Sequence, residues 1–268
     1  MLHQVKTLAL LGASALLGSL SVIKADVVTY NWNVTTIDAS GFDGVSIDAY
    51  GINNQPCHQF PIEVELGQEV EVSVTNLLNE STCIHWHGMK QLGTQEMDGT
   101  SEVTQCHIHP NQTAVYRFTP DKAGTFWWHS HHGAQYAFGL RGPLIVHPPA
   151  EQQTPWEAEV DEEITVQLAD WYHAYPKAPV WDTVLINNRG TYNCTAAANA
   201  GLECNPDQPL SRFRFESGKL YRIRLFNMAA LAPFNFSIDD HDFQVIAADG
   251  ENLAPTGALT HLVINAGQ

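Results

Sequence analysis

Three pairs of histidines in this chain are separated by a single residue, and such pairs can hold metal ions. Alternate residues of a strand project from the same face about 7 Å apart. Two imidazoles at that distance do not easily share one ion, so a pair suits two neighbouring ions, and imidazole favours copper, zinc and iron. Bulky tryptophans beside two of the pairs can wall off a metal site. The pairs are His85/His87, His107/His109 and His129/His131, and the tryptophans are Trp86, Trp127 and Trp128.

Two longer strings place the first and third pairs in a recognisable context. One runs from His85-Trp-His-Gly88 through Asp98-Gly99 to Gln105-Cys106, and the other from Gly124-Thr-Phe-Trp-Trp-His-Ser-His131 through Gln135-Tyr136 to Gly139-Leu-Arg-Gly-Pro143. Together they resemble the two N-terminal copper-binding signatures of multicopper oxidases, specifically those of fungal laccases. Further landmarks extend the resemblance over nearly the whole chain after residue 25: Ala169-Asp-Trp-Tyr-His173, Leu185-Ile-Asn187, Phe236-Ser-Ile238 and Ala248-Asp-Gly250.

The resemblance implies a fold, a cofactor and a set of site residues. The fold would be all-β, with tandem cupredoxin-like Greek-key β-sandwich domains. The cofactor would be copper and the co-substrate O2. His85 would bind the type 2 copper of a trinuclear cluster, and His87, His129 and His131 would bind the pair of type 3 coppers. Asp98 matches the family's acidic residue that helps to supply protons for oxygen reduction.

The middle pair fits the family less well. By register, Cys106-His-Ile-His109 stands where the family has Gln-Cys-Pro-Ile, so His107 replaces a proline. We therefore predict His107 and His109 to be strand or loop histidines without a copper role. Cys106 matches a family cysteine that commonly pairs with one near the far C-terminus. The isolated histidines are predicted to be structural: His58, His147, His173, His241 and His261.

Half of the family's eight cluster histidines and all of its type 1 copper ligands are not found in the sequence. A complete member has four His-x-His pairs and a type 1 copper site of two histidines and a cysteine. After Arg141 the sequence has neither a His-x-His nor a His-Cys-His. We therefore expect a fragment with part of the trinuclear cluster and no type 1 site, inactive when isolated. Two-domain family members that assemble sites between subunits still carry the Cys/His motif, so that alternative is rejected.

Three functions remain open at this stage. The leading one is a laccase-like oxidase that removes single electrons from phenolic or other aromatic donors and reduces O2 to water. The second is a ferroxidase or ascorbate oxidase of the same superfamily. The third is a non-catalytic, copper-binding cupredoxin protein. The acidic residue that would receive a phenol's proton falls near Leu231 or Ala232, and neither can do so.

Short strands must position these residues, because alternating apolar and polar residues recur between Gly, Pro, Asn and Asp. The pattern favours β-sandwiches, with a Pro/Glu/Gln-rich linker between two domains. We predict a signal peptide at residues 1–25, domain 1 at 26–149, a linker at 150–157 and an incomplete domain 2 at 158–268. The predicted strands are Ile62–Leu66, Val70–Val74, Ala114–Phe118, Leu144–His147, Ile164–Leu168, Leu220–Leu225, Phe234–Ile238 and Val245–Ala248.

Composition and charge narrow the environment and the partners. The 268 residues carry 13 Lys+Arg against 29 Asp+Glu, a net charge of −16, which argues against nucleic acid as a partner. An apolar run from Leu8 to Ile23 before Lys24 reads as a secretory signal, so we expect an extracellular protein with no membrane partner after its removal. Five Asn-x-Ser/Thr sequons predict N-glycans: Asn33, Asn79, Asn111, Asn193 and Asn235.

Five cysteines in an oxidising compartment should mostly form disulfides. Cys194 and Cys204 flank a Gly/Ala/Asn loop and could close it. Cys57 with Cys83 is a weaker possibility. Cys106 would then lack a partner within this chain.

Overall fold

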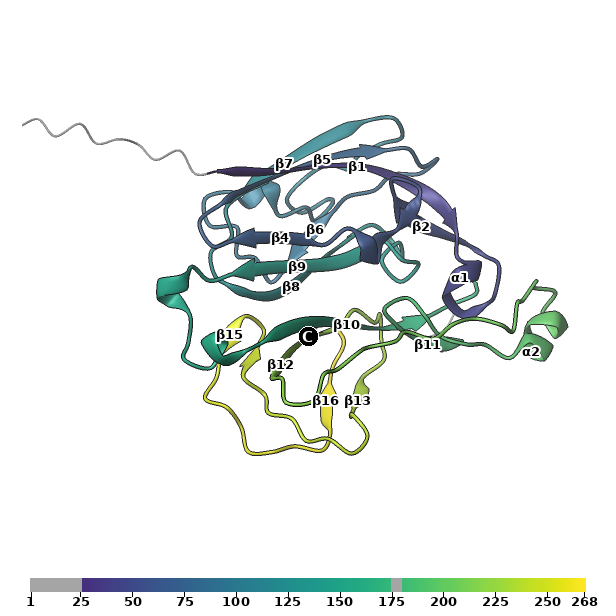
Figure 1. Cartoon of the computed structure of the whole chain (residues 1–268). Coiled ribbons are helices and arrows are strands. Elements are labelled where there is room, and N and C mark those ends of the chain that lie inside the picture. Colours follow the sequence, from purple (N-terminus) through teal and green to yellow (C-terminus); the bar gives the residue numbers. More distant parts are fainter. Residues whose placement is uncertain (1–25, 175–179) are drawn as a thin grey trace, which may run out of the picture.

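A computed structural model describes residues 26–174 and 180–268, and the signal peptide predicted at residues 1–25 lies outside them. The regular secondary structure of the described chain is mostly β-strand, as predicted (Figure 1). Its α-helices are short: α1 (Ser40–Asp43) and α2 (Cys194–Asn199). Among the described residues, no helix has the length and apolarity needed to cross a membrane.

The N-terminal domain contains two sheets. In spatial order the larger sheet has β3 (Gln55–Pro56), β2 (Asp48–Ile52), β1 (Val27–Asp38), β5 (Glu69–Asn76) and β7 (Thr113–Phe118). The other has β4 (Ile62–Glu65), β9 (Arg141–His147), β8 (Gly124–His129) and β6 (His85–His87). Figure 1 shows them as separate layers. Along β5 every second residue is buried, so one face of the strand lines the core.

Three tryptophans form the centre of this core. The ring centroid of Trp32, from β1, lies 4.5 Å from that of Trp128 on β8 and 6.3 Å from that of Trp86 on β6. Trp86 and Trp128 are fully buried, and they are neighbours in the β6–β8 pairing. Trp86, between His85 and His87, and Trp128, just before His129, therefore anchor the strands from inside, while the histidines point to the other face.

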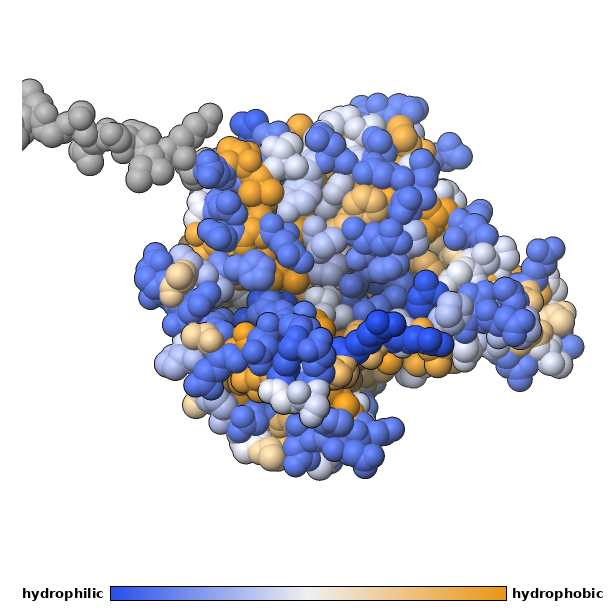
Figure 2. All heavy atoms as spheres, viewed as in Figure 1, coloured by the Kyte–Doolittle hydropathy of each residue, from blue (hydrophilic) through white to orange (hydrophobic). Residues whose placement is uncertain are grey.

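The second domain follows η3 (Ala150–Gln152) and η4 (Glu157–Glu159), two 3₁₀ turns in and beside the predicted linker. Its largest sheet has the order β11 (Thr183–Ile186), β10 (Glu162–Trp171) and β12 (Tyr221–Asn227). Two further strand pairs are β13 (Phe234–Phe236) with β16 (Leu262–Ile264), and β14 (Ala247–Ala248) with β15 (Glu251–Asn252). On the face shown in Figure 2, hydrophilic residues predominate and smaller groups of apolar residues lie between them.

Contacts that include buried charges join the two domains. The Arg224 side chain, from β12, is 2% exposed and binds Glu163 through two nitrogens, at 2.8 and 3.0 Å. A third nitrogen donates to the Thr125 hydroxyl on β8 at 2.8 Å. At the other end of the interface, His173 Nε2 lies 2.7 Å from Asp43 Oδ2 on α1, which is the structural hydrogen bond predicted for His173.

The cysteine predictions are partly confirmed. Cys194 and Cys204 form a disulfide. The Cys57–Cys83 pairing is wrong, because these two buried thiols occupy separate environments and both are free. Cys57 Sγ contacts the Tyr50 carbonyl at 3.8 Å, and burial raises its pKa to about 12. Within the part of the chain that the structure describes, Cys106 is exposed and has no partner, as expected.

Candidate metal centre

Pairing between β6 and β8 brings the first and third histidine pairs together. The two strands run antiparallel, with His85 directly opposite His129. His87 lies two residues along β6 and so projects from the same face as His85. Local alternation and strand register therefore place three imidazoles on one side of a single sheet.

These three side chains form a close group of metal-binding atoms. One ring nitrogen from each of His85, His87 and His129 lies within 4.8 Å of the other two. His87 Nδ1 and His129 Nε2 are 3.3 Å apart. Two nitrogens bound tetrahedrally to one ion at the usual imidazole bond length are also about 3.3 Å apart. The donor set therefore fits a metal ion such as copper without rearrangement of these two rings.

His131 completes a four-histidine arrangement from just beyond the end of β8. Its ring centroid lies 5.6 Å from that of His85 and 6.0 Å from that of His129. It is exposed, whereas His129 is buried, so it faces the open side of the group. The structure thus brings together all four histidines that the sequence singled out as copper ligands.

Backbone carbonyls orient two of the rings. His85 Nδ1 lies 2.8 Å from the Asp98 carbonyl, and His129 Nδ1 lies 2.9 Å from the Ser130 carbonyl. A carbonyl oxygen only accepts, so each Nδ1 carries the proton and each Nε2 presents its lone pair. Such contacts from behind fix the tautomer of metal-binding histidines.

Asp98 lies beside the group rather than in it. Its carboxylate Oδ1 is 3.5 Å from His85 Nδ1, and Oδ2 accepts a hydrogen bond from the Thr100 hydroxyl at 2.8 Å. The side chain is 23% exposed. Asp98 can therefore exchange a proton with solvent while remaining close to the histidines.

Gly99 allows the Asp98 loop to approach β6, and replacing it should be costly. Its φ is +83°, and a Cβ there would lie 1.6 Å from the Ile84 carbonyl oxygen. We expect Gly99→Ala to lower the free energy of unfolding by about 2–4 kcal/mol, because backbone strain and a clash with the main chain combine. Urea denaturation measures the change.

Gly93→Ala is the matched control for this prediction. Gly93 also has a positive φ, of +78°, but a Cβ there meets nothing within 4 Å. Its replacement should cost about 1 kcal/mol from strain alone. Equal losses for the two variants would show that the contact with Ile84 is unimportant.

Burial keeps the imidazoles in the neutral form that binds metals. It lowers the pKa of His129 to about 3, and the nearby histidines act in the same direction. Burial also lowers the pKa of His85, against an opposing effect of the Asp98 carbonyl, and the pKa of His87. At neutral pH these three rings therefore present lone pairs without first losing a proton.

The metal-free chain should lose stability in mild acid. Unfolding returns the His129 pKa from about 3 to an ordinary value of about 6.5. Below about pH 6.5 the unfolded chain binds a proton at His129 that the folded chain does not. The free energy of unfolding is therefore highest above about pH 6.5 and decreases as the pH falls towards 3. We expect the thermal midpoint, measured with chelator present, to fall between pH 7 and 4. His129→Gln should flatten this dependence, and an unchanged slope would contradict the assignment to His129.

A cavity of about 600 Å³ opens beside the four histidines, and both domains line it. The Trp127 ring stacks on His87 at a centroid distance of 4.9 Å and lies 4.3 Å from His129. Tyr136 packs against His129 at 5.2 Å. Aromatic rings thus fix the imidazole planes and exclude water from one side of the group.

The contribution of the second domain to the wall of this cavity was not predicted from the sequence. Trp127 Nε1 donates to the Gly267 carbonyl at 3.3 Å, across 140 residues. Ala229, Ala230 and Ala266 also line the cavity. Small residues in a loop and a turn carry no sequence signal for such a role. No role was predicted for His132 either, although it directly follows His131 in the sequence.

Comparison with known proteins now identifies the family. A family model described as multicopper oxidase matches residues 33–151, and a second with the same description matches residues 162–268. The chain belongs to the multicopper oxidase family. A multicopper oxidase is a copper oxidoreductase, so the family implies copper as the metal of this chain.

Curated relatives carry three kinds of name. Laccase-1 of Fomitopsis schrenkii is 42% identical over 198 residues, covering 71% of this chain and 34% of the relative. Iron transport multicopper oxidase fetC of Epichloe festucae is 35% identical over 243 residues, covering 88% and 37%. L-ascorbate oxidase of Cucumis sativus is 38% identical over 250 residues, covering 84% and 41%. The chain thus spans between a third and about two-fifths of the length of these relatives.

A solved structure agrees with the fold. The laccase from Botrytis aclada superposes with a TM-score of 0.78 at 32% identity, covering 92% of this chain and 46% of that one. The match confirms the cupredoxin-like, all-β architecture predicted for this multicopper oxidase.

Proposed function

We propose that this chain supplies half of the oxygen-reducing copper centre of a laccase-like enzyme that oxidises phenolic or other aromatic donors. The observation that carries the proposal is the close group of His85, His87 and His129, with His131 beside it. We assign His85 to a type 2 copper, and the other three to a type 3 pair. Bound copper supplies one-electron redox chemistry, which couples donor oxidation to the reduction of O2 to water.

The chain's own residues hold this centre, shield it from water and supply protons to it. The Nε2 atoms of His85 and His129 face away from the carbonyls that fix their Nδ1 protons. Trp127 and Tyr136 cover the rings on one side. Asp98 is placed to pass protons from solvent, because its carboxylate is partly exposed and lies 3.5 Å from His85 Nδ1.

Electron entry requires groups that the described residues do not bring together. In the described ranges, 26–174 and 180–268, one group of three donors has all its ligand atoms within 4.8 Å of one another, and it consists of histidines and contains no cysteine. A type 1 copper site needs a cysteine with two histidines. We therefore propose that the 268-residue chain, expressed alone, binds copper but does not turn over.

Oxygen consumption by the purified, copper-loaded chain tests this part of the proposal. We expect no O2 uptake with a phenol and no blue type 1 absorbance. Phenol oxidation with that absorbance would overturn it.

A test of the donor class requires a form of the protein that also supplies a type 1 copper site. With such a form, kcat/KM should be higher for a phenol than for Fe²⁺ or ascorbate. A preference for Fe²⁺ or ascorbate would instead support the second candidate, a ferroxidase or ascorbate oxidase, the activities that the names of two relatives suggest. Copper binding without any turnover would support a non-catalytic cupredoxin protein.

We also propose that the protein is secreted and N-glycosylated. All five sequon asparagines are exposed: Asn33, Asn79, Asn111, Asn193 and Asn235. Protein from a eukaryotic secretory host should begin at Asp26 and lose mass on treatment with an N-glycosidase. Retention of residues 1–25 in medium-derived protein, or an unchanged mass, would contradict these assignments.

A further inference from the structure

A second histidine cluster lies outside the four-histidine group. The ring centroids of His107 and His132 are 4.8 Å apart, with the rings nearly perpendicular. His107 Nε2 lies 3.2 Å from the Glu102 carboxylate. His107 therefore lies between a second imidazole and a carboxylate, where the loop before β7 approaches the segment after β8.

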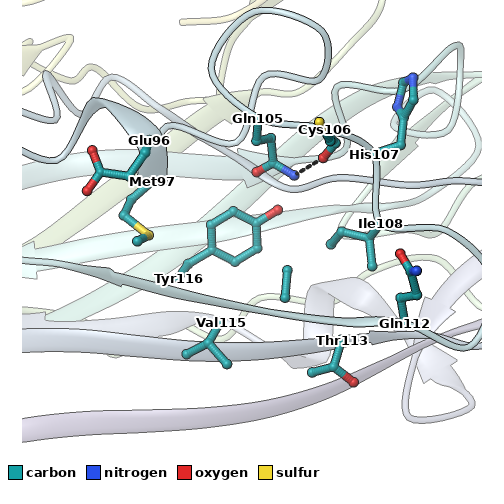
Figure 3. A pocket seen from close by; sticks show the side chains of 11 residues that line it. Glu96, Met97, Gln105, Cys106, His107, Ile108, Gln112, Thr113, Val115 and Tyr116 are labelled. Atoms are coloured by element: carbon teal, nitrogen blue, oxygen red, sulfur yellow. Dashed lines mark hydrogen bonds between the residues drawn. The ribbon is translucent and has the colours of Figure 1, made fainter.

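The contacts of His107 leave part of its ring unsatisfied. His107 Nδ1 is buried and has no hydrogen-bond partner among the described residues. His132 makes a ring contact with His107. His107 and Tyr116 both line a cavity of about 220 Å³, and Figure 3 shows the His107 ring pointing away from Tyr116. The ring therefore belongs to the His132 side of the loop.

The ring separation fits a shared metal ion. Imidazole nitrogens lie 2.0–2.1 Å from a bound transition metal, so two rings on one tetrahedral ion have centres about 5 Å apart. Glu102 is 80% exposed at its side chain and can adjust its carboxylate to such an ion. Two histidines and a carboxylate are a known donor set for divalent transition metals, and Cu²⁺ binds most tightly to such sites.

We propose that His107, His132 and Glu102 form a second metal site, which takes a divalent transition metal ion, Cu²⁺ most tightly. The ion ties the loop at residues 101–107 to the segment that carries His131. A hydrogen bond from Ser101 Oγ to the His131 carbonyl, at 3.1 Å, already joins the same two segments. This site departs from the sequence prediction that His107 has no copper role, and it is separate from the four-histidine group.

Equilibrium dialysis of the full chain against Cu²⁺ tests the proposal. His107→Ala should bind one ion fewer per chain than the unmodified chain. Glu102→Gln, at an exposed position that should not affect folding, should weaken binding at this site by about tenfold or more. The double variant His87→Ala/His129→Ala should retain this ion, and its Cu²⁺ EPR spectrum should show coupling to two nitrogens.

His109→Ala is the matched control. His109 is on the same loop, but its Nδ1 lies 3.0 Å from the Ser81 hydroxyl, and its ring is 6.3 Å from that of His107. It should bind as many ions as the unmodified chain. An unchanged stoichiometry in folded His107→Ala together with unchanged affinity in Glu102→Gln would overturn the proposal. So would the loss of all copper from the double variant.

Discussion

Replacing His129 with alanine is expected to lower the affinity of the candidate centre for Cu²⁺ by more than about 100-fold. His129 is buried, lies opposite His85, and places its Nε2 3.3 Å from His87 Nδ1. The loss should exceed the 10–100-fold that removal of a merely supporting group costs, because the variant removes a metal-binding atom itself. Competition against a chelator of known affinity measures the change at neutral pH.

His147→Ala is a suitable control for this variant. His147 is on β9 in the same sheet, with its side chain 39% exposed, and it is not among the residues that line the cavity. It should bind Cu²⁺ as the unmodified chain does. Unchanged affinity in folded His129→Ala would show that this imidazole is not a ligand and would remove the basis of the type 3 assignment.

Period-two alternation predicted most of the fold because many strands have one buried face. β5 is the clearest case, and β4, β7, β9, β10, β12 and β13 overlap the predicted segments. β1 was missed, although it has 12 residues and its Tyr30, Trp32 and Val34 alternate with exposed polar residues. β1 pairs with β2 at its C-terminal end and with β5 along its N-terminal part, and the parallel contact with β5, more than 30 residues away, is one that local patterns do not reveal.

The candidate centre was predictable to the extent that it depends on motifs. His85 and His87 share a face through strand geometry, and the family resemblance linked them to His129 and His131 before the β6–β8 register was known. The cavity wall was not predictable, because Gly267 reaches Trp127 only through domain packing. The second histidine cluster has the same origin, since His107 and His132 meet through tertiary structure alone.

Asp170→Asn is expected to destabilise the chain by about 3–5 kcal/mol, because it leaves buried groups without their partner. Asp170, on β10, is fully buried. Its carboxylate accepts hydrogen bonds from the backbone N–H groups of residues 230, 231 and 232, at 2.8, 2.8 and 3.1 Å. It also accepts from the Tyr172 hydroxyl at 3.0 Å, and its charge acts on the buried guanidinium of Arg141. An asparagine would turn an N–H₂ group towards donors and leave Arg141 uncompensated.

The same change should reach the metal centre, because the loop that Asp170 holds forms part of the cavity wall. Ala230 lines the cavity. Arg141 donates a hydrogen bond to the Tyr136 carbonyl, and the ring of Tyr136 packs on His129. Urea denaturation measures the free energy of unfolding. The Cu²⁺ affinity of the folded fraction measures the effect on the cavity wall, and we expect it to decrease. Tyr172→Phe removes one hydrogen bond to the same carboxylate and should cost only about 1 kcal/mol. If the two variants lose equal stability, the buried charge of Asp170 and its backbone contacts contribute no more than the single hydrogen bond from Tyr172.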